Sequence, residues 1–502
     1  MATSPPDNDG DADDLPEQFR VRKGKRAEML AAGVEPYVAS FERTHTIAQL
    51  RALFPDLAAG EETGERVAVA GRVIFLRNTG KLCFARLRDG DGTEVQAMLS
   101  LDRVGEESLA EFKRLVDIGD HLGVRGEVVQ SKRGELSVMA EEWLITSKAL
   151  RPLPVEHKEL SDETRIRQRY VDLITRPQAR AAARRRVDTT RALRESLHRR
   201  GFDEIETPIL QTLHGGAAAR PFSTHMNAYD IPLYLRIATE LFLKRAVVGG
   251  MHHVFEIGRV FRNEGADSTH SPEYAMLEAY SVYSDYHDIA RLTRELIQEA
   301  ALAVMGTLVI ERDDGTEQNL SGEWDMVDLY SRVSEAVDDE ITPATDQATL
   351  YEVAGKNGIE LPADVGPGKA VEELLEELVV PTFTRPTFVL DYPVDTSPLV
   401  RQHRSKQGVV EKWDLYIDQT ELATGYTELT DPVVQRERLT EQARLAAAGD
   451  PEAMALDEDF VRAIEYGLPP LGGMGMGVDR LLMVLTGLGI RETMLFPLVK
   501  PE

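Results

Sequence analysis

The chain has 502 residues, of which 42% are hydrophobic and 28% charged, and its formal net charge is −27. This composition is ordinary for a globular protein of two to four domains, and it argues against nucleic-acid binding unless Lys and Arg gather locally. The single cysteine, Cys83, excludes an intramolecular disulfide framework and a cysteine-rich zinc site, and it fits a reducing compartment. No apolar run reaches the ~20 residues that span a bilayer, and the acidic N-terminus lacks the apolar core of a signal peptide. We therefore expect a cytoplasmic protein that makes no contact with a membrane.

The N-terminal part of the chain falls into four regions. Residues 1–17 are rich in Pro, Asp and Gly and predict a disordered acidic tail, and residues 18–60 have helical periodicity. Residues 61–150 hold five short alternating strands, with a helix between the third and the fourth, which is typical of an OB-type β-barrel. The Pro-containing segment 151–165 predicts a linker.

One outer face of the predicted barrel carries an aromatic side chain beside arginines. Alternation along LCFARLR places Cys83 in the core and Phe84 outside, and on the next strand Gln96 also faces out. Such a face can stack on and hydrogen-bond an unpaired base. Alternatively, Phe84 covers a barrel edge or packs on a neighbouring domain, and spacing alone leaves both interpretations open.

Residues 166–502 predict a larger domain with a helical insertion at about 300–385, the segment with the least chemistry. Its first part contains a run of arginines: Arg176, Arg180, Arg184, Arg185, Arg186, Arg191, Arg194, Arg199 and Arg200. A solvated helix face, a subunit interface and an RNA contact all fit this run. A helix at 187–200 ends at Gly201, and FDEIETPIL follows as a strand closed by Pro208.

Residues 255–280 predict a β-hairpin with a charged face over an apolar backing. Arg262 and Glu264 share one face of the outgoing strand, while Glu278 and Tyr280 share a face of the returning strand in an otherwise apolar stretch. A rigid sheet presents catalytic groups in this way. The alternative is a surface hairpin with cross-strand ion pairs.

Near the C-terminus, GMGMGVDR alternates glycines at 473, 475 and 477 and then enters a helix. One face of this strand has no side chains, so a flat ligand such as adenine can lie on the backbone around Gly475. Asp479 can cap the helix, and Arg480 in its first turn opposes the helix dipole, which suggests a nearby anion. Close helix packing is the alternative. Neither the dinucleotide fingerprint nor the P-loop fits any glycine segment here.

Three blocks, FDEIETPIL, FRNEG…EY and GMGMGVDR, occur in the order seen in class II aminoacyl-tRNA synthetases, which this chain resembles. HGGAAARPF, YLRIATELFLKRAVVGG and ELATGYTEL make it similar to the bacterial-type class II lysyl-tRNA synthetases. The resemblance implies an α+β fold, in which an OB-type anticodon domain precedes a catalytic domain. The catalytic domain would hold a six-to-seven-stranded antiparallel sheet flanked by helices. It also implies a homodimer formed through the block that ends at Pro208.

The resemblance assigns roles to individual residues. Arg262 and Arg480 would be catalytic. The ATP site would comprise Arg262, Glu264, His270, Tyr274, Glu421, Gly475 and Arg480. The lysine site would comprise Gly216, Glu240, Arg262, Glu278, Tyr280, Thr424, Tyr426 and Glu428. Asp414 and Glu421 would bind Mg²⁺, with more than one ion per subunit, and Phe84 and Gln96 would read the anticodon.

Three positions depart from the usual family pattern. Thr269 stands where an arginine often contacts ATP, Thr424 replaces an asparagine near the substrate carboxylate, and Asp414 is shorter than the usual glutamate. Glu421 falls out of the alternation of ELATGYTEL, so a bulge or turn must intervene if it binds metal beside Asp414.

The resemblance implies ATP-dependent activation of lysine to lysyl-adenylate and its transfer to the 3′ end of lysine tRNA. One alternative is a synthetase-like ligase with a protein or lipid acceptor. The predicted barrel and the lack of predicted membrane helices argue against it. A second is a non-catalytic paralogue that senses lysine or RNA, and the retained phosphate arginines and metal carboxylates argue against that.

Overall fold

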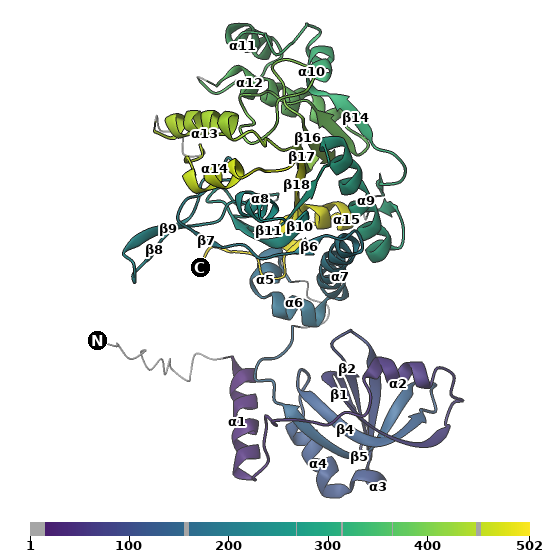
Figure 1. Cartoon of the computed structure of the whole chain (residues 1–502). Coiled ribbons are helices and arrows are strands. Elements are labelled where there is room, and N and C mark those ends of the chain that lie inside the picture. The colour runs from purple at the N-terminus through teal and green to yellow at the C-terminus, as the bar shows by residue number, and fades with distance from the viewer. Residues whose placement is uncertain are drawn as a thin grey trace. The chain divides into compact units, whose positions relative to one another are not determined.

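The computed structural model describes residues 16–154, 160–267, 269–312, 315–363, 365–447 and 453–501. The chain divides into two units, Met1–Arg180 and Ala181–Glu502, and each is considered by itself (Figure 1). Most of the predicted tail (1–15) and part of the predicted linker (155–159) lie outside the described residues. Within the described ranges, no helix combines the length and the apolar character that crossing a membrane requires.

The first unit contains a closed five-stranded barrel in the order β1-β2-β3-β5-β4, which confirms the predicted OB-type fold. The strands are β1 (Glu62–Asn78), β2 (Leu82–Arg88), β3 (Glu94–Ser100), β4 (His121–Gln130) and β5 (Leu136–Ser147). The helices are α1 (Glu17–Ala31), α2 (Ile47–Leu53), α3 (Leu101–Val104), α4 (Glu106–Leu115), α5 (Asp162–Arg167) and α6 (Arg169–Thr175). Strict alternation fills the barrel, with Cys83, Ala85 and Leu87 of β2 buried against their counterparts on β3.

The second unit is built on an eight-stranded sheet in the order β14-β15-β16-β17-β18-β11-β10-β6. The strands are β6 (Asp203–Glu204), β10 (His253–Phe261), β11 (Glu273–Val282), β14 (Asp325–Asp328), β15 (Thr387–Leu390), β16 (Lys412–Ile417), β17 (Thr420–Thr427) and β18 (Leu471–Gly477). The six central strands are antiparallel, while β6 and β14 pair in parallel at the two edges. The sheet is therefore larger than expected and mixed, because a short strand joins each edge in parallel.

The helices of this unit are α7 (Pro177–Arg199), α8 (Glu240–Val248), α9 (Tyr286–Met305), α10 (Leu329–Val337), α11 (Gln347–Lys356), α12 (Pro367–Leu374), α13 (Pro432–Ala447), α14 (Glu458–Glu465), α15 (Val478–Thr486) and α16 (Ile490–Thr493). A π-helical turn, η1 (Leu375–Val379), continues α12, and a 3₁₀ turn, η2 (Val380–Thr382), follows it. Smaller elements are the sheet of β7 (Leu210–Gln211), β8 (Ser223–Met226) and β9 (Ile231–Leu235), and the hairpin of β12 (Val309–Glu311) and β13 (Glu317–Asn319).

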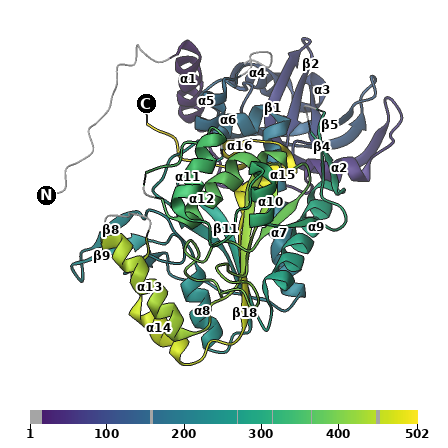
Figure 2. The same cartoon turned by 90° about the horizontal axis from the view of Figure 1, so that it is seen from above.

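One face of the large sheet is apolar and covered. Every second residue of the central strands, such as Leu277, Trp413 and Met476, packs against α7, α9 and α15. In Figure 2, seen from above, α7 and α9 lie on one side of β18, and α8, α13 and α14 lie on the other.

The opposite face is covered only at its two ends. Near β10 and β11, α8 and α14 pack on Val254 and Val282, and near β15 and β16 the insertion helices pack on Val389 and Tyr416. Polar side chains and glycines occupy the middle of this face. The functional site lies there, between the two apolar clusters.

Candidate active site on the open face of the sheet

Four neighbouring strands contribute one residue each to a row across the open face. Glu278 of β11 pairs with Gly475 of β18, Gly475 pairs with Thr424 of β17, and Thr424 pairs with Asp414 of β16. Because directly opposed residues in a sheet point to the same side, these side chains share one surface. Gly475 keeps the centre of the row free of any side chain.

A second row lies two residues further along each strand. It consists of Tyr280, Gly473, Tyr426 and Lys412, paired in that order. A Cβ on Gly473 would collide with the ring of Tyr280 and with Glu428 Oε1, so only glycine fits there. The glycine strand is thus the floor of a site whose walls are polar.

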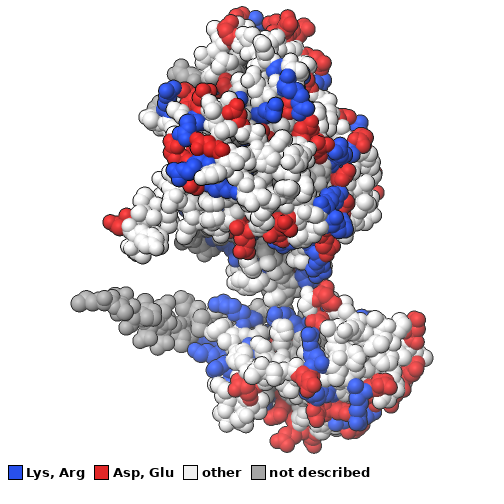
Figure 3. Space-filling model, in the orientation of Figure 1, with Lys and Arg blue, Asp and Glu red and all other residues white. Residues whose placement is uncertain are grey.

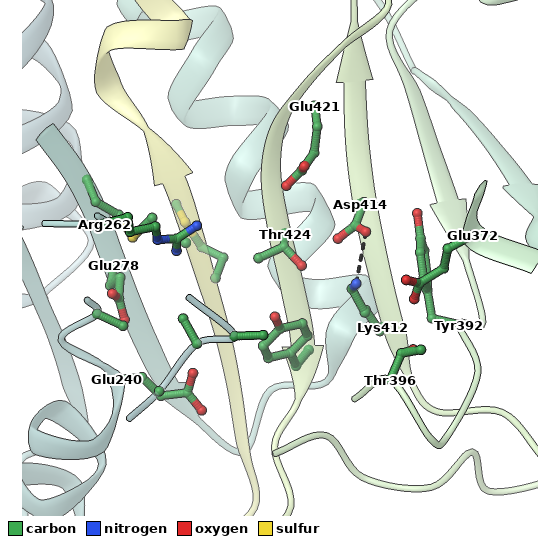
Figure 4. A pocket seen from close by; sticks show the side chains of 18 of the residues that line it. Glu240, Arg262, Glu278, Glu372, Tyr392, Thr396, Lys412, Asp414, Glu421 and Thr424 are labelled. Carbon is green, nitrogen blue, oxygen red and sulfur yellow. Dashed lines mark ion pairs between the residues drawn. The ribbon is translucent and has the colours of Figure 1, made fainter. Parts of the chain in front are cut away.

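A cavity of about 390 Å³ lies over these rows. Figure 4 shows Glu240 and Glu278 at one side of it and Lys412, Asp414 and Glu372 at the other. It is lined by seven of the eight residues predicted for lysine: Gly216, Glu240, Arg262, Glu278, Tyr280, Thr424 and Tyr426. Both predicted metal ligands line it too. We call it the amino-acid cavity.

A second cavity of about 250 Å³ adjoins the first, and we call it the nucleotide cavity. It is lined by all seven residues predicted for ATP: Arg262, Glu264, His270, Tyr274, Glu421, Gly475 and Arg480. Arg262, Met276, Glu421, Thr424 and Gly475 line both cavities. The two spaces therefore meet, and Arg262 stands at their junction.

Arg262 follows the last residue of β10 and is held by its backbone, whose N–H donates to Pro272 O at 2.9 Å. Its guanidinium lies 5.5 Å from the ring centre of Tyr274, a cation–π contact that fixes the plane of the group. Arg262 Nε is buried and has no hydrogen-bond partner among the described residues. A buried donor of this kind is suited to an anionic ligand at the junction.

Arg480 lies in the first turn of α15. Its Nη1 donates to the backbone oxygen of Glu421 at 2.5 Å, and Nη2 lies 3.2 Å from His270 Nε2. Asp479 does not cap the helix, contrary to the prediction: it accepts from the N–H of Ala275 at 2.7 Å and pairs with Arg186 of α7. The carboxylate ties α15 to the sheet and so fixes the direction of Arg480.

The tip of the hairpin is organised by Asp267. Its Oδ1 accepts from the N–H groups of Thr269 and His270, both at 2.7 Å, and these bonds lower the pKa of this carboxyl. Thr269 and His270 both line the nucleotide cavity. The threonine that replaces the usual arginine is thus at the site, where its hydroxyl is engaged with Asp267 at 3.0 Å.

Glu278 is buried and already accepts two hydrogen bonds, from Thr239 N–H at 2.8 Å and from Tyr280 OH at 3.1 Å. Burial, together with the charge of Glu240, raises its pKa to about 7. In the absence of a ligand, the Glu278 carboxyl therefore gains or loses its proton near neutral pH. A bound cation would favour the charged carboxylate. An ammonium group is the ligand that such a site favours.

Glu428, the eighth predicted lysine residue, lies behind the lining of the amino-acid cavity. Lys244 Nζ is 2.5 Å from Glu240 Oε1 and 2.5 Å from Glu428 Oε2, and all three side chains are buried. Burial and the neighbouring acids raise the pKa of Glu428. Lys244 lies within the segment YLRIATELFLKRAVVGG, but no role was predicted for it from the sequence, although its position four residues after Glu240 on a helix was a usable signal.

The predicted metal carboxylates come together through a β-bulge. Leu415 pairs with Ala423 but Tyr416 pairs with Glu421, so Leu422 is the extra residue that re-aims Glu421, as predicted from its broken alternation. Asp414 Oδ2 lies 2.9 Å from Lys412 Nζ, whereas its buried Oδ1 has no hydrogen-bond partner within the part of the chain that the structure describes. Two carboxylates with a free buried oxygen suit a hard divalent cation. Among the described residues, no group of three or more His, Cys, Asp or Glu side chains is placed to hold a metal ion.

The insertion contributes to the site, although we expected little chemistry there. Glu372 of α12 and Glu376 of η1 line the amino-acid cavity, and Tyr416 OH donates to Glu376 at 2.6 Å. The π-helical turn begins at Leu375, immediately before Glu376, as is common where a helix presents a functional side chain. The two glutamates are four residues apart on a predicted helix, and this spacing could have indicated from the sequence that both side chains face the same way.

In the barrel unit, Phe84 and Gln96 lie on the outer face, as the alternation predicts, and both are partly exposed. Gln96 pairs across the strands with Arg86, and its amide donates to Ser137 at 2.9 Å. Arg86 also lies over the exposed ring of Phe75, at 5.6 Å. Aromatic and guanidinium groups thus share this face.

Most arginines of the predicted run have partners within the chain. Arg186 binds Asp479, Arg194 binds Glu204, and Arg200 binds Glu295 and Glu299. Figure 3 shows acidic and basic side chains intermixed on the visible face of the second unit, Ala181–Glu502. Internal pairing favours a structural role over an RNA contact for these side chains.

Residues 161–500 match the family described as tRNA synthetases class II (D, K and N), and residues 67–146 match the OB-fold nucleic acid binding domain. The chain is 61% identical to a lysine--tRNA ligase of Mycolicibacterium gilvum over 490 residues, which are 97% of this chain and 98% of that protein. It is 59% identical over 497 residues to a lysine--tRNA ligase of Mycobacterium tuberculosis, with 98% of each covered. A lysylphosphatidylglycerol biosynthesis bifunctional protein LysX of Nocardia farcinica is 49% identical over 492 residues, or 97% of this chain, but only 43% of that protein is covered. By motifs, fold and these matches, the chain belongs to the class II tRNA synthetases, in the family of the lysine--tRNA ligases.

Proposed function

We propose that this protein activates lysine with ATP and transfers it to the 3′ end of lysine tRNA. The observation that carries this proposal is the meeting of two cavities at Arg262. One offers buried carboxylates to a diamine, and the other offers arginines to a polyphosphate. A lysine carboxylate and an ATP α-phosphate would meet at the same guanidinium.

In the first step, a carboxylate oxygen of lysine attacks the α-phosphorus in line. A P–O bond forms as the bond to the bridging oxygen breaks, and pyrophosphate leaves with that electron pair. Arg262 neutralises the charge that gathers at the junction, and Arg480 holds the far phosphates. The rate enhancement then comes from positioning and electrostatics, without a strong general base.

In the second step, a ribose hydroxyl of the terminal adenosine attacks the carbonyl carbon of lysyl-adenylate. The ester bond forms, AMP leaves, and its phosphate oxygen takes up the hydroxyl proton. The residues that fit a divalent cation are Asp414 and Glu421, and Mg²⁺ bound there, with more than one ion per subunit, would offset phosphate charge. The backbone oxygen of Glu421 also accepts a hydrogen bond from Arg480. Glu421 would therefore position both the metal ion and the arginine that contact the triphosphate.

Three further assignments belong to this proposal. Phe84 and Gln96 would read the anticodon, by stacking and hydrogen bonding.

The protein would act as a homodimer, because the motif that ends at Pro208 is followed by exposed apolar residues, Ile209, Leu210 and Leu213. It would work in the cytoplasm, which its single thiol and its substrates suit. Sedimentation of the purified chain tests the dimer.

Lysine-dependent exchange of pyrophosphate into ATP tests the activation step, and charging of lysine tRNA tests the transfer. Arg262→Ala should abolish exchange. Arg259→Ala, on β10 three residues before Arg262 and away from both cavities, should retain it. Wild-type protein without exchange at saturating lysine would refute the proposal, and exchange without charging would favour a protein or lipid acceptor.

A further inference from the structure

Lys244 is a buried charge that the proposed mechanism does not use. It lies on α8, one turn after Glu240, with a fully buried side chain. Its ammonium contacts one oxygen of Glu240 and one of Glu428, each at 2.5 Å. Since Glu428 directly follows β17, this lysine joins two parts of the site that are far apart in sequence.

Three buried carboxylates belong to this part of the site: Glu240 and Glu278 line the amino-acid cavity, and Glu428 lies behind its lining. An unpaired buried charge is strongly unfavourable, so each carboxylate needs a cation or a proton. Lys244 compensates one of the three charges. Two remain, and lysine has two ammonium groups.

The carboxylate oxygens that Lys244 does not contact also indicate that two negative charges remain for a ligand. Both oxygens of Glu428 are buried without a hydrogen-bond partner among the described residues: Oε2 forms the ion pair with Lys244, whereas Oε1 lies against Gly473 beside the ring of Tyr280, which lines the cavity. Glu240 lines the cavity itself. Lys244 therefore takes one oxygen from each acid and leaves the others for a ligand.

We propose that Lys244 is a positioning residue that fixes the separation between Glu240 and Glu428, so that the site selects an amino acid by the distance between its two ammonium groups. This inference rests on the proposed function. Lys244 itself does not line the cavity and acts through the two acids. Loss of its ammonium frees both carboxylates and leaves a third charge without compensation.

Lys244→Met, assayed by pyrophosphate exchange with lysine and with ornithine, tests the inference. Ornithine has the same groups but is one methylene shorter. We expect the KM for lysine to rise by about tenfold or more, the scale of one charged hydrogen bond. The preference for lysine over ornithine in kcat/KM should fall by a similar factor, while the KM for ATP stays unchanged.

Lys148→Met is the matched control. Lys148 is equally buried and also lies between two carboxylates, 2.6 Å from Asp117 and 2.7 Å from Asp120, but it belongs to the barrel unit. The Lys148→Met substitution should lower the free energy of unfolding without changing exchange kinetics or the preference for lysine over ornithine. A selectivity change common to both variants would reveal a general effect of buried charge and overturn the inference.

If Lys244→Met does not fold, the double variant Lys244→Met/Glu428→Gln removes the excess charge and takes its place in the assay, with Glu428→Gln alone as the reference because Glu428 is itself assigned to lysine. The proposal is overturned if a folded variant keeps its preference for lysine, or if kcat falls while the KM for lysine and the preference stay constant. Failure of the wild-type protein to exchange with lysine would instead refute the proposed function.

Discussion

Replacing Glu278 by glutamine should weaken lysine binding and, above neutral pH, stabilise the ligand-free protein. Glutamine keeps an acceptor for the Thr239 N–H but cannot carry the charge that an ammonium needs. Loss of one charged hydrogen bond, worth about 1.5–3 kcal/mol, corresponds to a rise of roughly ten- to hundredfold in the KM for lysine.

The stability effect follows from the raised pKa of Glu278, from 4.5 to about 7. The folded protein holds a proton that the unfolded chain releases between these values, so stability falls as pH rises through this window. At about 1.4 kcal/mol per pKa unit, the full penalty above pH 7 is about 3 kcal/mol. Glu278→Gln removes that penalty and should gain stability over wild type between pH 5 and pH 8.

Urea denaturation at pH 5 and pH 8 without ligand, followed by exchange kinetics at pH 8, measures both effects. Glu441→Gln is the control, because it removes the same charge from an exposed site on α13. It should change neither the lysine KM nor the pH dependence of stability. The reasoning fails if Glu278→Gln loses as much stability as wild type between pH 5 and pH 8, or if its lysine KM equals that of wild type.

Two further predictions concern the barrel and the metal. Phe84→Ala should raise the KM for tRNA about five- to hundredfold in charging assays, the scale of one base stacked on an aromatic ring, and leave exchange intact. The opposite pattern would make Phe84 structural. Glu421→Gln should raise the Mg²⁺ concentration for half-maximal exchange by about tenfold, since one of two carboxylates is lost. An unchanged Mg²⁺ requirement would remove Glu421 from the metal site.

Alternation allowed much of the site to be predicted. In strands, every second side chain faces the same way, so Glu278 and Tyr280 could be placed together from the sequence. The same rule failed at Glu421, and that failure correctly indicated a bulge. Local periodicity is sufficient wherever a single strand decides the direction of a side chain.

Contacts between distant segments could not be predicted in this way. Lys244 meets Glu428 only because α8 packs under the sheet, and Glu372 reaches the cavity only because the insertion folds back over β16. The helix cap assigned to Asp479 was wrong for the same reason, since a sheet N–H and Arg186 compete for its carboxylate. The edge strand β14 was too short to be recognised from periodicity, and of the strand predicted at FDEIETPIL only Asp203–Glu204 pairs with the large sheet, as β6.

Two of the three positions that depart from the usual family pattern, Thr424 and Asp414, pair directly with each other on adjacent strands. A single structural change can therefore account for both. Each position has a side chain that reaches less far from the backbone than the one the family usually places there, and the two are direct neighbours on adjacent strands. The changes are therefore best understood as one widening of the cavity at a single row. Restoring asparagine or glutamate alone would crowd or misalign its neighbour, so the two positions should vary together among relatives, and their effects on activity should not be additive.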